Sequence, residues 1–158
     1  MKYSDDFYDE NHNLILASFL GIICGIVSGI ACISDVGAAY IFISILIGNL
    51  IVLKVDGLHH IFSLISFFII CIIFGIPDLN LIVLLICILT IIADEVCHEL
   101  FADNQNSFLS LFFEYRFLMK IVVFLLAIFN VFDISVFIYF MLFEISYAMA
   151  GFVFKKLN

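Results

Sequence analysis

The densest run of side chains able to do chemistry is Asp94–His98, with the sequence DEVCH. On a helix, residues three or four positions apart share a face, so Asp94 and Glu95 can both converge with His98. Carboxylates and imidazoles are ligands for Zn, Mn or Fe, and carboxylates alone suit Mg. The run therefore predicts a divalent metal site, with Asp94 and His98 as ligands and Glu95 as a catalytic residue that can also bind the metal.

A second set of ligand types stands earlier in the chain, where Asp56 is followed by His59 and His60, which we also predict to bind metal. Glu95-x-x-His98 resembles the ligand motif of carboxylate-bridged di-iron helix bundles. Asp56-x-x-His59-His60 resembles part of the histidine boxes of membrane desaturases and hydroxylases. Di-iron bundles use two Glu-x-x-His units, and desaturases have many more histidines than the four of this chain. The chain is assigned to neither family.

Basic residues near these acids indicate a second chemistry. Arg116 and Lys120 are four apart and share a helix face, and with Lys54 they predict a phosphate or diphosphate headgroup site. Asn49 and Glu144 interrupt apolar runs, where polar groups are costly. We therefore predict that Asn49 contacts the substrate and that Glu144 acts as a catalytic base or supports another catalytic group.

The elements that must position these residues are membrane spans. The chain is 66% hydrophobic and 13% charged, with a mean hydropathy of +1.30, which excludes an ordinary soluble domain. A hydrocarbon core about 30 Å thick needs about 20 helical residues, close to the length of the apolar runs. We predict a single all-α domain of six transmembrane helices, at residues 13–33, 36–54, 59–76, 79–98, 117–130 and 131–153.

The basic residues predict the orientation, because Lys and Arg near span ends stay in the cytoplasm. The six of them all fall on one side of the predicted spans: Lys2, Lys54, Arg116, Lys120, Lys155 and Lys156. We predict a multi-pass cell-membrane protein with both termini cytoplasmic and residues 1–12 as an acidic cytoplasmic tail. No basic patch points to nucleic acid, so the predicted partner is the lipid bilayer.

Small residues recur every four positions in the first predicted span, at Ala17, Gly21, Gly25 and Gly29. Such a stripe lets another helix backbone approach closely. It predicts packing against a neighbouring span, and the alternative is a homodimer through Gly21, Gly25 and Gly29.

Acids also precede three of the spans on the opposite side from the basic residues, at Asp35, Asp78 and Asp133. A carboxylate there can accept hydrogen bonds from the free N–H groups of a first helical turn. We predict that these acids are helix caps and assign them no chemistry.

Together these patterns predict an integral membrane protein with a polar site on its cytoplasmic side. The leading interpretation is a metal-dependent enzyme acting on a lipid or isoprenoid phosphate. One alternative is a small proton- or metal-coupled transporter, and another is a non-catalytic accessory subunit whose polar cluster only stabilises helix ends. A transporter needs polar residues through the full membrane depth, and the outer halves of the spans offer only scattered Ser, Thr and Tyr, which favours the enzyme.

Overall fold

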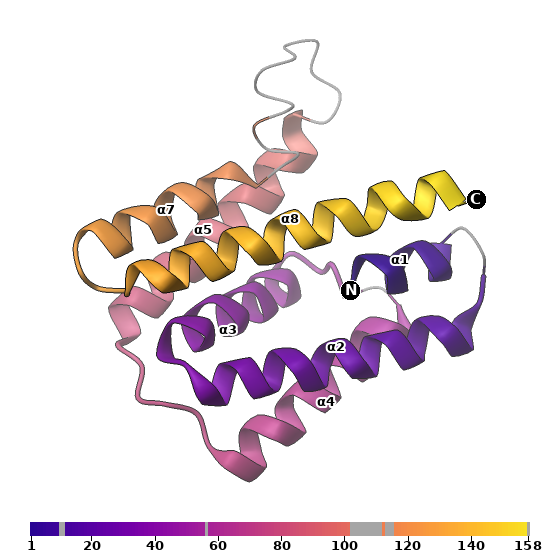
Figure 1. Cartoon of the computed structure of the whole chain (residues 1–158), viewed down its shortest axis with the longest axis horizontal. Helices are drawn as coiled ribbons and strands as arrows, with labels where there is room; N and C mark the ends of the chain where they lie inside the picture. The colour runs from indigo at the N-terminus through magenta and orange to yellow at the C-terminus, as the bar shows by residue number, and fades with distance from the viewer. Residues whose placement is uncertain (10–11, 56, 102–111, 113–115, 158) are drawn as a thin grey trace.

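The computed structural model describes residues 1–9, 12–55, 57–101, 112 and 116–157. Over these residues the fold is all-α, with seven helices and no strands (Figure 1). The helices are α1 (Lys2–Asp9), α2 (Leu14–Ser34), α3 (Val36–Ile51), α4 (Leu58–Phe74), α5 (Leu81–Phe101), α7 (Phe117–Ile128) and α8 (Ile134–Leu157).

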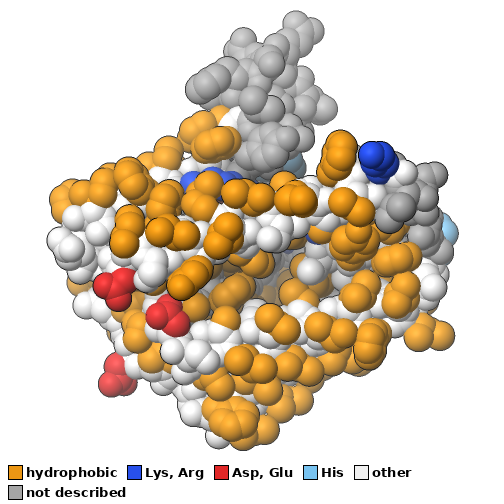
Figure 2. Space-filling view, viewed as in Figure 1, with side chains coloured by type: hydrophobic (Ala, Val, Ile, Leu, Met, Phe, Trp, Pro, Cys, Tyr) orange, Lys and Arg blue, Asp and Glu red, His pale blue; other side chains and the backbone are white. Residues whose placement is uncertain are grey.

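Three helices are long and apolar enough to cross a membrane, namely Leu14–Ser34, Leu81–Phe101 and Ile134–Phe154. The other apolar helices, α3, α4 and α7, have 16, 17 and 12 residues, shorter than the segments expected there. Hydrophobic side chains cover most of the face seen in Figure 2, and Ile72 is 79% exposed. A surface of this kind is typical of a protein surrounded by lipid.

The two ends of the bundle differ. The α2–α3 and α7–α8 turns lie together at the left of Figure 1, while α1, the start of α2 and the end of α8 lie toward the right. We call the right-hand side the α1 end. Figure 2 shows acidic side chains gathered at the opposite end on this face.

Helices α2 and α4 pack closely through the predicted glycine stripe. A Cβ placed on Gly25 would overlap the carbonyl oxygen of Ser63, and one on Gly21 would overlap the carbonyl oxygen of His59. Both partners are backbone atoms of α4, which cannot move aside without shifting the helix. The stripe is therefore used within the chain, and a second copy could reach it only by displacing α4.

The largest buried cluster lies among α3, α5, α7 and α8. Its members are apolar side chains of mixed size that fill the space between the four helices. They are Tyr40, Ile41, Cys87, Ile91, Met119, Val123, Phe132, Val136 and Phe140. This cluster fixes the position of α5, whose last two turns carry the predicted site.

Two side-chain caps define helix starts at the end opposite α1. Asp35 accepts a hydrogen bond from the N–H of Ala38 at 2.7 Å, which confirms the predicted cap of α3. At α5 the side chain of Asn80, not Asp78, accepts hydrogen bonds from the first turn, at 2.9 Å from the N–H of Ile82. Asn80 directly precedes the helix, whereas Asp78 stands two residues too early.

Helix α1 occupies most of the segment expected to be an acidic tail. Tyr3 and Phe7 are four apart and share one face, where both rings contact Phe154 of α8 with centroids 5.9 and 5.1 Å away. Ser4 donates a hydrogen bond to the carbonyl of Ala17 on α2 at 2.7 Å. The aromatic face, which the run of acids obscures in the sequence, docks this helix on the bundle.

Candidate metal site between α1 and α4

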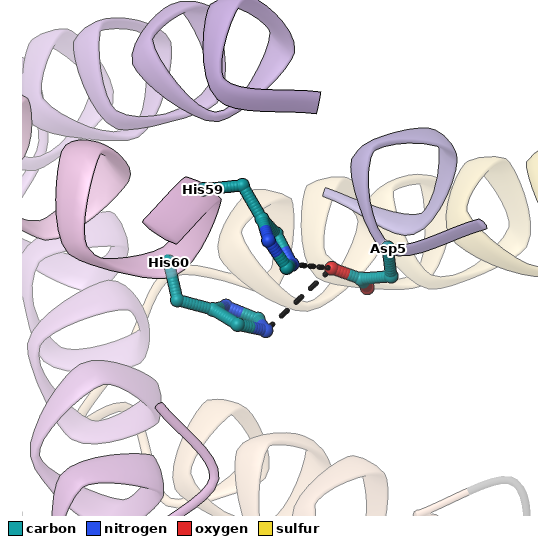
Figure 3. Close-up of side chains that lie close together, drawn as sticks. All are labelled: Asp5, His59 and His60. Atoms are coloured by element: carbon teal, nitrogen blue, oxygen red, sulfur yellow. Dashed lines mark hydrogen bonds and ion pairs between the residues drawn. The ribbon is translucent and has the colours of Figure 1, made fainter. Parts of the chain in front are cut away.

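A carboxylate from α1 and two imidazoles from α4 converge at the α1 end (Figure 3). Oδ1 of Asp5 lies 3.1 Å from Nε2 of His59 and 3.6 Å from Nε2 of His60. One ligand atom from each of the three side chains lies within 4.8 Å of the others. Among the described residues this is the one such group of three or more His, Cys, Asp or Glu side chains.

The first turn of α4 sets the direction of the two imidazoles. Neighbouring helical residues point about 100° apart, so two adjacent histidines share a partner only when it lies between their directions. Asp5 occupies that position from α1, and the two rings have centroids 4.2 Å apart. Gly57 contributes as well, since a Cβ there would overlap the ring of His59.

The site is largely shielded from water. Side-chain exposure is 3% for His59, 20% for Asp5 and 25% for His60, and the ring of Tyr8 packs on His59 with centroids 4.5 Å apart. Burial raises the pKa of the Asp5 carboxyl, although the nearby His60 and His59 oppose that shift. The charge of Asp5 is thus incompletely compensated, and a cation bound beside it would be stabilised.

The distances suit a small divalent ion. Tetrahedral zinc with bonds of about 2.0 Å places its ligand atoms about 3.3 Å from one another. The separations of 3.1 and 3.6 Å from Asp5 bracket that value, and the ligand atoms of His59 and His60 lie within 4.8 Å of each other. Two imidazole nitrogens with one carboxylate oxygen favour Zn²⁺ or Fe²⁺ over Mg²⁺. Three protein ligands also leave a coordination position for water or a substrate.

The predicted ligands are only partly brought together. His59 and His60 converge, while Asp56 lies outside the described residues. Asp94 and His98 on α5 do not join the group with His59 and His60. Asp5 was missed because it belongs to a run of acids that looked solvent-exposed, and the only signal for it was the aromatic spacing of Tyr3 and Phe7, which predicts that this segment docks.

Asp94 has a structural role in this fold. Its carboxylate accepts hydrogen bonds from the backbone N–H groups of Leu118, at 3.2 Å, and Met119, at 2.8 Å. These are first-turn groups of α7, which have no partner within their own helix. Asp94 is fully buried and caps α7 from α5.

Glu95, the predicted catalytic residue, lies in an ion-pair network with two of the predicted phosphate-binding residues. Its carboxylate pairs with Lys54 at 2.5 Å and with Arg116. Lys54 also reaches Glu99 at 3.6 Å. Both cations are thus neutralised by α5, and in this arrangement they hold helix ends together.

The remaining predicted residues, Asn49, Lys120 and Glu144, lie on α3, α7 and α8. Lys120 pairs with Glu144 at 2.8 Å, with both side chains largely buried. The backbone carbonyl of Asn49 accepts a hydrogen bond from the N–H of Lys54 at 2.9 Å. The side-chain Oδ1 of Asn49 is buried without a hydrogen-bond partner among the described residues.

Comparison with known proteins identifies no relative of this chain. No protein-family model, no curated protein and no solved structure matches the chain. Its function must therefore be inferred from residue chemistry and geometry.

Proposed function

We propose that this chain is a multi-pass cell-membrane protein that binds a divalent transition-metal ion at its cytoplasmic face through Asp5, His59 and His60. The observation that carries the proposal is the convergence of three ligand atoms from two helices on one shielded point. Zn²⁺ and Fe²⁺ are the ions that this ligand set fits best.

The proposed topology has six spans with both termini in the cytoplasm. The one-sided placement of Lys and Arg supports it. So does the position of the start of α2 and the end of α8 on the same side of the bundle in Figure 1. In this topology local thinning of the bilayer would accommodate the short helices α3, α4 and α7.

A competing interpretation is that Asp5 merely ties α1 to α4 by hydrogen bonds. In that case Nε2 of His59 hydrogen-bonds Oδ1 of Asp5 at 3.1 Å, and Nε2 of His60 lies 3.6 Å from the same oxygen, beyond hydrogen-bond range. A metal ion instead uses the lone pairs of neutral imidazoles and compensates the charge of a poorly hydrated carboxylate. A metal ion would bind all three side chains at once, whereas the hydrogen bond at 3.1 Å involves Asp5 and His59.

Reaction with a lipid or isoprenoid phosphate is the activity that we propose to test first. The open coordination position supports it, because a metal-bound water is a nucleophile near neutral pH and a metal polarises phosphoryl oxygens. Arg116 and Lys120 are ion-paired with Glu95 and Glu144, so a metal held by Asp5, His59 and His60 would supply the positive charge that a phosphate group needs.

Metal binding can be measured directly on the full chain in detergent or nanodiscs. We expect elemental analysis and titration with Zn²⁺ to give one ion per chain. The variants His60→Ala and Asp5→Asn should lose that ion, while the matched control His98→Ala should keep it. A wild-type protein that binds no Zn²⁺ or Fe²⁺ at micromolar concentration would contradict the proposal, as would equal loss in His98→Ala.

A further inference from the structure

Helix α1 lies between α8 and the packed pair of α2 and α4. In Figure 1 it sits between the end of α8 and the starts of α2 and α4. It contacts all three helices, with Phe7 against Phe154 of α8, Ser4 bonded to α2 and Asp5 facing the histidines of α4. A single short helix thus joins α8 to the α2–α4 pair at this end.

Helix α1 is short and docks through contacts with α2, α8 and α4. The helix has eight residues, and a helix of this length is not stable by itself in water. Its contacts outside the metal site include the ring contacts to Phe154, the Ser4 hydrogen bond and the packing of Lys2 on Gly151. Ligand bonds from Asp5 to an ion held by His59 and His60 would add a direct link between α1 and α4, the helix that α1 contacts least among its three partners.

We infer that the metal ion acts as a clasp: by bonding Asp5 of α1 together with His59 and His60 of α4, it holds α1 across this end of the bundle and ties α8 to α2 and α4. The inference rests on the proposed metal site and adds that metal binding controls the docking of α1. Metal loss releases α1, and metal binding restores the docked position.

Linkage makes the clasp reciprocal. If the metal stabilises docked α1, docked α1 must strengthen metal binding by the same factor. A substitution that weakens docking without touching a ligand must then weaken metal binding. If Phe7→Ala lowers the docked fraction to about one tenth, the apparent Kd for Zn²⁺ rises about tenfold.

Hydrogen exchange of the full chain in nanodiscs tests the clasp. With Zn²⁺ bound, amides of residues 2–9 should be protected, and removal of the ion with EDTA should speed their exchange about tenfold or more, while amides of α5 stay unchanged. In Asp5→Asn the exchange of α1 should be fast with or without Zn²⁺. The same samples are titrated with Zn²⁺ to follow binding itself.

A matched pair of phenylalanine variants completes the test. Phe7→Ala should raise the Zn²⁺ Kd and speed exchange in α1, whereas Phe152→Ala, at a 71% exposed position on α8, should change neither. A wild-type protein that binds no Zn²⁺ would overturn the proposed function and the clasp together. One that binds Zn²⁺ with unchanged exchange in α1, or with Phe7→Ala at wild-type affinity, would overturn the clasp alone.

Discussion

The carboxylate of Glu95 lies 2.5 Å from the ammonium group of Lys54, although the two residues are 41 positions apart in the chain. Glu95 is 2% exposed and also pairs with Arg116, so one buried carboxylate holds two cations that come from the end of α3 and the start of α7. This network places the ends of three helices relative to one another.

Replacing Glu95 with Gln should destabilise the protein, because it leaves Lys54 and Arg116 without their shared partner. Removing one member of a buried pair costs about 3–5 kcal/mol, and the partial exposure of both cations reduces this to about 2 kcal/mol. Thermal unfolding in detergent measures the loss. Glu99→Gln is the control, since Glu99 is 66% exposed and should change stability by less than about 0.5 kcal/mol.

Replacing Asp94 with Ala should lower stability and leave metal binding intact. The change removes both acceptors for the first turn of α7, and loss of a cap costs about 1–2 kcal/mol. Asp94→Asn keeps one acceptor oxygen and should lie between Ala and wild type. Loss of Zn²⁺ from a folded Asp94→Asn protein would show instead that Asp94 is a ligand, as the sequence had predicted.

Replacing Gly25 with Ala should loosen α2 from α4, because the added Cβ would overlap the backbone of Ser63. We expect a cost of about 1–3 kcal/mol, as for other overpacked contacts, and Gly25→Leu should be worse. Val27→Leu is the control, at a 60% exposed position on the same helix. Wild-type thermal stability of Gly25→Ala would mean that the two helices are not in this close contact.

Zinc should stabilise the wild-type protein against unfolding. A ligand that binds only the folded state contributes about 2.7 kcal/mol at a concentration one hundred times its Kd. The rise in unfolding temperature should disappear in His59→Ala and His60→Ala and persist in His98→Ala. An equal rise in all three variants would point to binding elsewhere on the chain.

The positions of the six apolar helices could be predicted well from the sequence, because each of these helices coincides with a continuous apolar run. The run at 13–33 corresponds to α2 at Leu14–Ser34, and the small residues at Gly21 and Gly25 correctly indicated close packing. The shorter helices end earlier than predicted where Val52 and Phe129 leave helical geometry, since hydropathy continues past the last hydrogen-bonded turn.

The partners of the charged residues could not be predicted in the same way. Spacing of three or four showed that Asp94, Glu95 and His98 share a region of one helix, but it carries no information on which other helix that region meets. In the fold Asp94 meets α7, Glu95 meets Lys54 and Arg116, and the histidines of α4 meet Asp5.

The amino-acid sequence was enough to predict the six apolar helices, their apolar surface and the small face of α2, because these are properties of single segments. Tertiary structure alone decided that Asp5 lies 3.1 Å from His59, 54 residues away along the chain. Ion pairs and metal ligation act over a few ångströms, so they depend on how α1, α2 and α4 pack and not on the periodicity of any one helix.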